Sequence, residues 1–305
     1  MGQKIGKKVR IRIGTLLTAN DVIIENNVSI GPFCIIKTKK LRIGAYSKIQ
    51  PLSIISTQNV DFRKHIHIAP LVVIKGEQSK KSSIILDDHS RVFPFCWIDT
   101  GHGVEIGKNV GIGGHTLIFT HGVWPNYLDG AGVSFGKVVI EDNVWIPWRV
   151  FILPNTHIGT NSIVGGNSLL NKTYPPNSLI GGSPAKIIKE NIGQTISPEE
   201  KLGRFNEIIH AYLDYKDLPI AEKEKNKINL DGIILSIDST DNLPEGAILV
   251  LLNSSLSQTE IDVLNQKGIH IIDHLNKQLI KASKSKKLDE FVSYLRRYGV
   301  RLYNK

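Results

Sequence analysis

Residues 140–169 consist of five consecutive six-residue units, and each unit begins with an aliphatic residue. A period of six fits neither an isolated helix nor an isolated strand, and it is typical of a parallel β-helix built from hexapeptide repeats, with three units in each triangular coil. The residues expected to stack inside the column are Ile140, Ile146, Ile152, Ile158 and Val164. The small or β-branched residues expected at its corners are Val144, Val150, Thr156, Ser162 and Ser168. The sequence therefore predicts a mainly β fold.

The same period extends upstream with interruptions, through Ile24, Ile30, Ile43, Ile49, Ile68, Leu86, Val92, Ile106 and Ile112. It breaks at 56–66, 75–83 and 120–137, where polar residues, glycine or lysines replace it, so we expect loops to leave the column there. Because a rigid scaffold positions its loops for function, the long loop at 120–137 is the first place to look for a site. The column is expected to end near residues 171–176.

The composition predicts a globular chain of two domains, because 305 residues with 41% hydrophobic content supply enough core for both. The first residues contain no apolar segment, and no apolar run reaches the length of a membrane span. Cys34 and Cys96 both occupy repeat positions. We interpret them as small buried residues of a reducing compartment, which favours a cytoplasmic location.

Positive charge is concentrated in clusters, and the net charge is +10. The chain begins with one such cluster, a second follows at 37–42, and the last 29 residues hold nine lysines or arginines against two acids. Such clusters suit the phosphates of a nucleotide, a lipid-linked substrate or a peripheral contact with an anionic membrane surface. A solvated basic surface is the simpler alternative. Nucleic acid is not favoured, because no aromatic-interleaved basic motif accompanies the clusters.

The residue pattern changes after the column. This change predicts a β-helix domain at 1–192, a helix and linker at 193–230 and a small α/β module at 231–305. Ser197 is the expected N-cap of a helix, with Pro198 at its first position and Glu200 completing a capping box. The polar run 222–229 resembles a linker. The pattern then predicts strands at 232–237, 247–252 and 269–272 and helices at 257–267 and 288–298, arranged around a small parallel sheet.

The C-terminal module lacks a glycine-rich phosphate loop, because the turn after its second predicted strand is Asn253-Ser254-Ser255-Leu256. We therefore expect an interaction or substrate-presenting module. A degenerate nucleotide-binding fold is the alternative.

Residues 20–190 resemble the hexapeptide-repeat acyltransferases, which are left-handed β-helix enzymes. The resemblance is carried by 143–168, by the Asn171-Lys172-Thr173-Tyr174-Pro175-Pro176 segment and by Gly182-Ser183-Pro184-Ala185-Lys186. Within the family, the loop after Ile112 is most similar to that of the sugar and polysaccharide O-acetyltransferases. The resemblance implies acetyl transfer from acetyl-coenzyme A to a sugar hydroxyl or amine, and a homotrimer with active sites between neighbouring columns. It leaves the C-terminal module unexplained.

Acetyl transfer to a hydroxyl needs a base, and histidine suits this role because its pKa lies near the working pH. His121, at the start of the long loop, matches the position of the family's catalytic histidine and is our candidate base. His115 and His102 are candidates for orienting the acceptor, with a plain surface position as the alternative for both. Asp99 and Glu105 are both candidates for orienting an imidazole, and the sequence does not choose between them.

The resemblance also implies a coenzyme A groove, in which small residues allow close approach. Trp145 matches a position beside the acyl end, Asn171 and Lys172 match positions near adenosine, and Lys186 one toward the phosphates. The small residues of this groove are Gly165, Gly166 and Ser168. The alternative is that each glycine only forms a corner of a coil and that each lysine only belongs to the solvated surface. One departure is Pro147-Trp148, where the family has a glycine followed by a small residue, so Trp148 either lines the coenzyme channel or closes it.

Three functions follow from this pattern. The leading one is an acetyl-CoA-dependent O-acetyltransferase acting on a sugar of a surface polysaccharide or its precursor. The second is N-acetylation of a nucleotide-linked amino sugar, and the third is a non-catalytic trimeric scaffold whose C-terminal module binds a partner. A zinc site like that of the related γ-class carbonic anhydrases is not favoured, because His115 and His121 lack that class's spacing, and no metal is expected.

Overall fold

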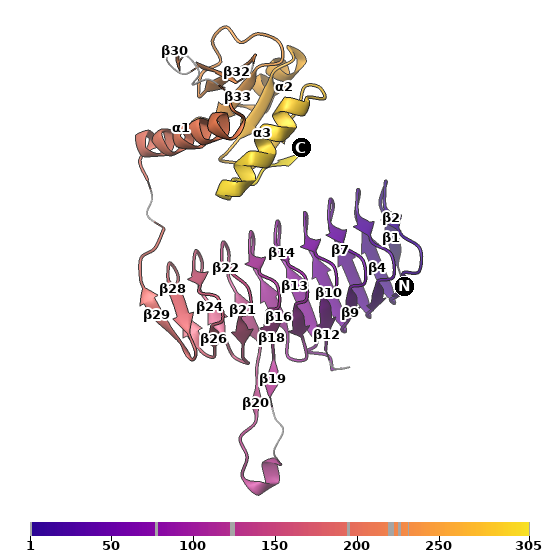
Figure 1. The fold of residues 1–305 in the computed structure, drawn as a ribbon. Helices are drawn as coiled ribbons and strands as arrows, with labels where there is room; N and C mark the ends of the chain where they lie inside the picture. Colours follow the sequence, from indigo (N-terminus) through magenta and orange to yellow (C-terminus); the bar gives the residue numbers. More distant parts are fainter. Residues whose placement is uncertain are drawn as a thin grey trace. The chain divides into compact units, whose positions relative to one another are not determined.

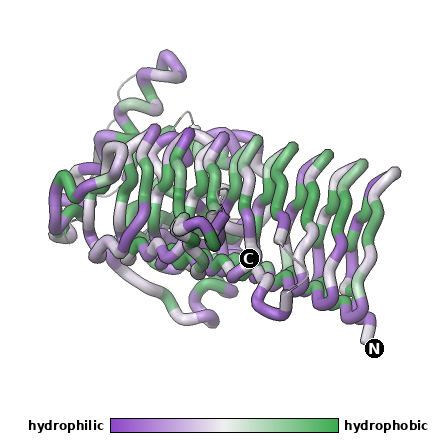
Figure 2. Tube along the Cα trace, turned by 90° about the horizontal axis from the view of Figure 1, so that it is seen from below, coloured by the Kyte–Doolittle hydropathy of each residue, from purple (hydrophilic) through white to green (hydrophobic). Residues whose placement is uncertain are grey.

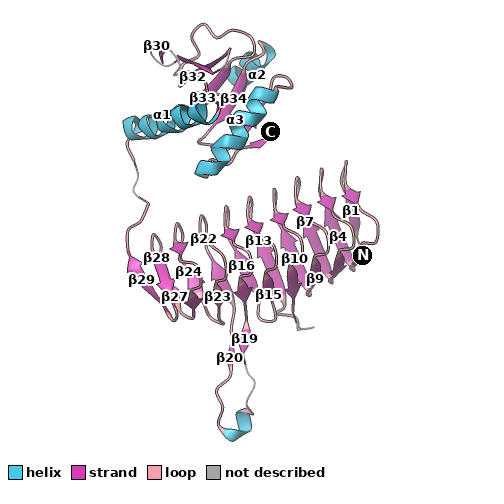
Figure 3. Cartoon of the chain, in the orientation of Figure 1, coloured by secondary structure: helices cyan, strands magenta, loops and turns pink. Residues whose placement is uncertain are grey.

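The computed structural model describes residues 2–76, 79–122, 126–193, 196–218, 223–224, 227–230 and 232–304. The chain divides into two compact units, Met1–Gln194 and Thr195–Lys305. The first is a column of stacked β-coils, and the second is an α/β module (Figures 1 and 3). The predicted fold class, a left-handed parallel β-helix of hexapeptide repeats followed by a small C-terminal α/β module, is confirmed.

Three parallel sheets form the sides of the column. The first sheet contains β1 (Gln3–Ile5), β4 (Asp21–Ile24), β7 (Lys40–Ile43), β10 (Asn59–Phe62), β13 (Ser83–Leu86), β16 (Val104–Ile106), β21 (Val138–Ile140), β24 (His157–Ile158) and β27 (Thr173–Tyr174). The second sheet contains β2 (Arg10–Ile11), β5 (Ser29–Ile30), β8 (Lys48–Ile49), β11 (His67–Ile68), β14 (Arg91–Val92), β17 (Gly111–Ile112), β22 (Trp145–Ile146), β25 (Ile163–Val164), β28 (Leu179–Gly182) and β29 (Ala185–Lys189). The third sheet contains β3 (Leu16–Thr18), β6 (Ile35–Lys37), β9 (Ile54–Ser56), β12 (Val73–Lys75), β15 (Trp97–Asp99), β18 (Leu117–Ile118), β23 (Phe151–Ile152) and β26 (Leu169–Leu170).

The interior of the column is a stack of aliphatic side chains, and hydrophobic residues recur from coil to coil along the chain (Figure 2). Every residue predicted to face inward is buried, including Ile152 and Ile158 at 0% exposure. The predicted corner residues are buried as well. Cys34 and Cys96 are free thiols inside the stack, and burial raises the pKa of the Cys96 thiol to about 11.

The prediction of a loop at 56–66 is wrong, because β10 lies within this range and pairs in register with both β7 and β13. The first three steps from coil to coil along the first sheet span 19 residues, one more than three six-residue units. Lys40 pairs with Asn59, 19 positions later, whereas Trp145 pairs with Ile163, 18 positions later. The extra residue is accommodated at a corner, where the buried Thr38 hydroxyl donates to the Gln58 carbonyl at 2.9 Å.

The loop at 120–137 leaves the column as predicted. Its described part forms an antiparallel pair, β19 (His121–Gly122) with β20 (Ser134–Phe135), and a short 3-10 helix, η1 (Tyr127–Asp129). Figure 1 shows this hairpin projecting from the stack. Residues 123–125 of this loop and 77–78 of the predicted 75–83 loop lie outside the described residues. The column continues past the predicted end at 171–176, through β27 and β28, and β29 pairs antiparallel with β28.

Among its described residues, the second unit contains a seven-stranded mixed sheet and three α-helices. Its strands, in sheet order, are β30 (Lys223–Glu224), β31 (Lys227–Leu230), β32 (Ile233–Ile237), β33 (Ile248–Leu251), β34 (His270–Asp273), β35 (Gln278–Ile280) and β36 (Tyr303–Asn304). Its helices are α1 (Pro198–Tyr215), α2 (Gln258–Gln266) and α3 (Lys286–Leu295), and a 3-10 turn, η2 (Arg296–Tyr298), follows α3.

Several predictions for this unit need correction. The pairs β32–β33 and β33–β34 are parallel as expected, but β31 and β35 add antiparallel strands on either side. The run 222–229 is not a plain linker, because β30 and part of β31 lie within it. Residues 219–222, 225–226 and 231 lie outside the described residues. Helix α1 packs into the core of the module through Phe205 and Ile209, so the structure joins 193–230 to 231–305 instead of separating them.

The N-cap of α1 is Ser197, as predicted, and its side chain accepts a hydrogen bond from the Glu200 N–H at 3.1 Å. The Glu200 carboxylate pairs with Arg204 instead of completing a capping box. A capping box is present at α2, between Ser257 and Glu260.

Truncating two neighbouring residues of β13 should have very different effects on the free energy of unfolding. Ile84→Ala should lower the free energy of unfolding by about 2 to 5 kcal/mol, because Ile84 is fully buried and truncation leaves a cavity. Ile85 points out of the same strand and is only half-buried, so Ile85→Ala should cost much less. Urea denaturation monitored by circular dichroism measures both, and equal losses would contradict the assigned strand register.

Candidate active site

Asp99 and His121 meet at the corner between the third and first sheets. Asp99 is the last residue of β15, and Thr120 and His121 follow β18, which lies beside β15 in the third sheet. Because Trp97 pairs with Leu117, residues about one coil apart in sequence are brought side by side. The stacking of coils therefore creates the pair.

The Asp99 carboxylate is nearly enclosed, with 8% of its side chain exposed, and four donors surround it. Its Oδ2 accepts hydrogen bonds from the Thr120 N–H at 3.0 Å and the Thr120 hydroxyl at 2.7 Å. The same oxygen lies 2.7 Å from His121 Nδ1, and Oδ1 accepts from the Gly101 N–H at 3.1 Å. An ionised carboxylate only accepts hydrogen bonds, so it selects the His121 tautomer that carries its proton on Nδ1.

Burial raises the pKa of the Asp99 carboxyl, but the hydrogen bonds from Thr120 and Gly101 and the charge of His121 outweigh burial and hold this pKa below its ordinary value. Asp99 is therefore ionised at neutral pH. The His121 side chain is 37% exposed, so the imidazole is held on one side and reaches solvent on the other. A buried anion behind a partly exposed imidazole is the arrangement that a general base requires.

Of the two carboxylates proposed to orient His121, Asp99 does so. Glu105 forms an ion pair with Lys137 at the exit of the hairpin. Lys137 follows Phe135 and Gly136 in the segment between β20 and β21 that returns to the column. The Glu105 carboxylate therefore pairs with Lys137 beside the hairpin instead of contacting the imidazole.

His102 lies at the same corner as His121. Its backbone N–H donates to the Thr120 hydroxyl at 3.0 Å, and its ring lies 5.0 Å from that of Phe135. Phe135 is 52% exposed and pairs with His121 across β19 and β20. The sequence pattern does not identify Phe135 or Thr120 as site residues, because their positions at the site arise from the hairpin pairing and from the stacking of coils.

His115 lies at a different corner from His121, because a step of six residues moves the chain to the next side of the column. Its ring stacks on Phe95, with centroids 4.9 Å apart, and lies 6.0 Å from the indole of Trp148. The structure does not bring His115 and His121 together within one chain, and in the described structure His115 is part of an aromatic row along its corner.

The two tryptophans of the predicted coenzyme groove lie in different structural environments. Trp145 points outward from β22 in the second sheet, and its indole covers Gly111, where an added Cβ would lie 2.6 Å from the ring. Trp148 is 48% exposed at the corner after β22, and its indole lies over Gly114. A Cβ added at Gly166 would meet only the Trp148 carbonyl within 4 Å, so the indole does not cover that glycine.

Gly165, Gly166 and Ser168 form the next corner above Trp148. Gly166 is exposed, but Ser168 is 1% exposed and its hydroxyl is already engaged. That hydroxyl donates to the Gly165 carbonyl at 2.7 Å and accepts from the Gly182 N–H at 3.1 Å. Ser168 therefore stabilises the corner, and Gly166 is the residue that leaves a surface open to close approach.

Asn171 and Lys172 are exposed at the corner between the third and first sheets, the same corner as His121 but farther along the column. The Lys172 ammonium lies 5.7 Å from the centre of the Tyr174 ring. Lys186 is exposed on β29 and pairs with Gly181 of β28. Within one chain these three residues do not share a corner with Trp148 and Gly166.

Known proteins resemble part of the chain. The chain is 37% identical over 90 residues to the galactoside O-acetyltransferase of Lactococcus lactis, which covers 30% of this chain and 42% of that protein. It is 28% identical over 143 residues to the galactoside O-acetyltransferase of Escherichia coli, which covers 38% and 70%. A crystal structure of a hexapeptide-repeat acetyltransferase from Vibrio cholerae is 27% identical, with a TM-score of 0.36, and covers 50% of this chain and 74% of that one.

The names of the curated relatives confirm the resemblance to sugar O-acetyltransferases that the sequence indicated. The chain spans about half the length of the first curated relatives it matches, between 42% and 60%. No protein-family model matches it.

The setting of Asp99 predicts a pH-dependent contribution to stability. Asp99→Asn should lower the free energy of unfolding by about 1 to 3 kcal/mol at pH 7, because it removes the charge that four donors satisfy. Asp99 has a lowered pKa in the folded protein, so its contribution is present above the unfolded value near 3.9 and is lost as the pH falls through the folded value. The difference between wild type and variant should therefore shrink in acid.

Urea denaturation at pH 7 and below about pH 4 measures this difference. Glu105→Gln is the control, because both side chains of the Glu105–Lys137 pair are partly exposed, and ion pairs that reach solvent contribute little. A difference that persists in acid would show that the Asp99 charge does not matter.

Proposed function

We propose that the protein is an acetyl-CoA-dependent O-acetyltransferase that acts on a sugar hydroxyl in a surface polysaccharide or its precursor. The observation that carries the proposal is the Asp99–His121 pair, with its buried carboxylate and half-exposed imidazole. The relatives support it, because two of them are named galactoside O-acetyltransferases.

In the proposed reaction, His121 Nε2 takes the proton of the acceptor hydroxyl as its oxygen attacks the thioester carbonyl of acetyl-CoA. The tetrahedral intermediate then collapses, the carbon–sulfur bond breaks, and the coenzyme A sulfur leaves with the proton that His121 returns. Asp99 stays ionised throughout and stabilises the imidazolium that forms between these steps. An orienting carboxylate of this kind suits a hydroxyl acceptor, because a free amine needs less help from a base.

Coenzyme A, in this proposal, lies along the coils near Gly166, with Trp148 lining its channel. The setting of Trp148 supports a lining role, because its indole packs over Gly114 and leaves Gly166 uncovered. Asn171, Lys172 and Lys186 are exposed, which suits contacts with the adenosine and phosphate groups.

We also propose a homotrimer in which neighbouring copies cover the third sheet. The outward residues of this sheet form one in-register apolar row from end to end: Leu16, Ile35, Ile54, Val73, Trp97, Leu117, Phe151 and Leu169. The first sheet instead presents Lys40, Asn59 and Glu105 outward. A continuous apolar row on one side of a soluble column is typical of a surface covered by another copy.

A neighbouring copy would also complete the site. Trp145 faces outward from the second sheet, whereas His121 lies at the corner between the other two sheets. A single column therefore cannot bring the Trp145 indole to the His121 imidazole, but a neighbour packed beside the third sheet can supply it. The sugar acceptor would bind in the groove between the two chains.

We also propose where in the cell the protein acts. No helix among the described residues combines the length and the apolar character needed to cross a bilayer. A cytoplasmic enzyme with peripheral contact to an anionic membrane surface is consistent with the lysine and arginine clusters.

The proposed base predicts a kinetic result. His121→Ala should lower kcat for acetyl transfer to a galactoside hydroxyl by about 100-fold or more, while acetyl-CoA affinity measured by calorimetry stays near that of wild type. His157→Ala is the control, because its ring pairs with Glu141 on the outer face of the first sheet, away from the proposed interface, and its kcat should change far less. A similar loss in both variants would argue against His121 as the base, and a wild type that binds no acetyl-CoA would favour a scaffold.

The proposed trimer predicts the mass of the protein in solution and which substitutions should lower it. Light scattering should give three times the 33.9 kDa of one chain. Leu117→Glu combined with Phe151→Glu should reduce this mass, because the carboxylates would have to be buried at the interface. Val139→Glu, on the first sheet at the same level of the column, should leave the trimer intact. A wild-type monomer would refute the shared site.

A further inference from the structure

The two ends of the column differ in how they are closed. At the C-terminal end, β29 folds back antiparallel on β28, and the Tyr174 hydroxyl donates to the Ala185 carbonyl at 3.3 Å. Tyr174 and Ile180 of the last coil are buried there. At the N-terminal end (Figure 1), β1, β2 and β3 are the terminal strands of their sheets, and each has one hydrogen-bonded neighbour among the described strands.

The N-terminal end exposes side chains that occupy interior positions. Ile5 pairs with Ile24 and Ile11 pairs with Ile30, and these partners in the second coil are 1% and 0% exposed. Ile5 and Ile11 are 57% and 45% exposed, because they belong to the terminal strands. Ile13, at the corner between the second and third sheets, is 81% exposed. The end of the column is therefore an apolar surface bordered by strand edges.

Positive charge lies around this apolar surface. The first 20 residues contain five basic residues and no acidic residue. The five side chains are exposed, and they lie on β1, on β2 and at the corners that follow these strands: Lys4, Lys7, Lys8, Arg10 and Arg12. Among the described residues, none of these five forms an ion pair. The end therefore carries positive charge that neighbouring carboxylates do not neutralise.

The charge and the shape of this end favour one kind of partner. A second copy packed end to end would bring two sets of like charges together, which is unfavourable. A polypeptide strand added to one edge would leave the edges of the other two sheets open.

An anionic bilayer surface fits the charge, the apolar side chains and the strand edges together. Basic residues near such a surface contribute about 1 kcal/mol each. Apolar side chains enter the boundary between headgroups and acyl chains to a depth of about 5–10 Å. Backbone groups of the strand edges stay hydrated at this depth, whereas the hydrocarbon core would leave them unsatisfied.

We propose that the N-terminal end of the column is the surface that contacts an anionic membrane. Ile5, Ile11 and Ile13 enter the headgroup boundary, and the five basic side chains contact anionic headgroups. In the proposed trimer, cyclic symmetry places three such ends on one side, so that one bilayer is contacted by all three. The proposal rests on the membrane contact that is part of the proposed function, and a lipid-binding assay tests it apart from acetyl transfer.

The test is sedimentation of the full-length protein with vesicles of phosphatidylcholine alone, and of phosphatidylcholine and phosphatidylglycerol in equal parts. Wild type should sediment with the mixed vesicles only, and added salt should release it, because salt screens the attraction between exposed charges. Lys7→Gln combined with Lys8→Gln should weaken binding by about 10-fold or more. Lys64→Gln combined with Lys108→Gln is the matched control, because both lysines are exposed at the same corner of later coils, and it should bind like wild type.

A second pair of variants tests the apolar contact. Ile13→Glu should weaken sedimentation with the mixed vesicles, because a carboxylate replaces a side chain that enters the membrane boundary. Ile188→Glu should bind like wild type, because Ile188 is 64% exposed on β29, at the opposite end of the column.

Several results would overturn the proposal. Wild type that does not sediment with the mixed vesicles would do so, as would Lys7→Gln/Lys8→Gln or Ile13→Glu variants that bind as well as their controls. A mass of two trimers in light scattering that falls in Ile13→Glu would assign the end to a second copy instead. Acetyl transfer to a soluble galactoside should be unchanged by Lys7→Gln/Lys8→Gln, so failure of lipid binding and failure of the proposed activity are separate results.

Discussion

The stacking of one coil on the next is the constraint on which the column depends. Backbone groups of each coil donate to the coil beside it, as Gly6 N–H does to the Ile24 carbonyl at 2.7 Å, and the aliphatic side chains fill the space that this spacing leaves inside. Because each strand has parallel partners on both sides along most of the column, the corners are held rigidly. Residues such as Asp99 and His121 are therefore placed side by side without any dedicated local motif.

An ionised carboxylate is costly to enclose unless its oxygens are satisfied. Asp99 is enclosed at the point where the hairpin leaves the column, and Thr120, which begins this departure, supplies two of its hydrogen bonds. The loop and the carboxylate thus depend on each other. This coupling explains why the candidate site lies at the corner that bears the hairpin, while other corners carry rows of stacked rings or asparagine amides.

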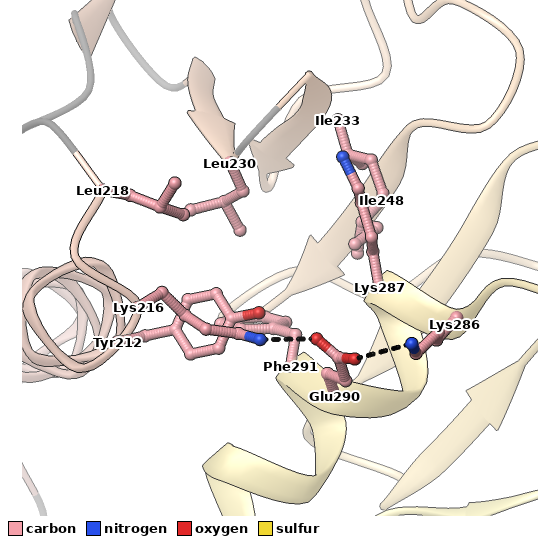
Figure 4. A pocket seen from close by; sticks show the side chains of 10 residues that line it. All are labelled: Tyr212, Lys216, Leu218, Leu230, Ile233, Ile248, Lys286, Lys287, Glu290 and Phe291. Carbon is pink, nitrogen blue, oxygen red and sulfur yellow. Dashed lines mark hydrogen bonds and ion pairs between the residues drawn. The ribbon is translucent and has the colours of Figure 1, made fainter.

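The three sides of the column share one interior but differ outside. The third sheet presents an apolar row that leads to the His121 corner, and the second sheet presents Trp145. The proposal of a site shared between copies rests on this asymmetry. The C-terminal module contains a separate pocket, in which Glu290 pairs with Lys216 (Figure 4).

The sequence by itself determined the column, because the six-residue period identifies the residues that stack inside it. The sequence also indicated His121, through the place of this residue at the start of the long loop. It failed at 56–66, where one extra residue per coil breaks the period while the hydrogen-bonded register continues, and at 222–229, where polar edge strands resemble a linker. Only the tertiary structure decided that Asp99 and not Glu105 holds the imidazole, and that His115 belongs to another corner. Both depend on which residues are stacked across coils, and a local sequence pattern does not record that pairing.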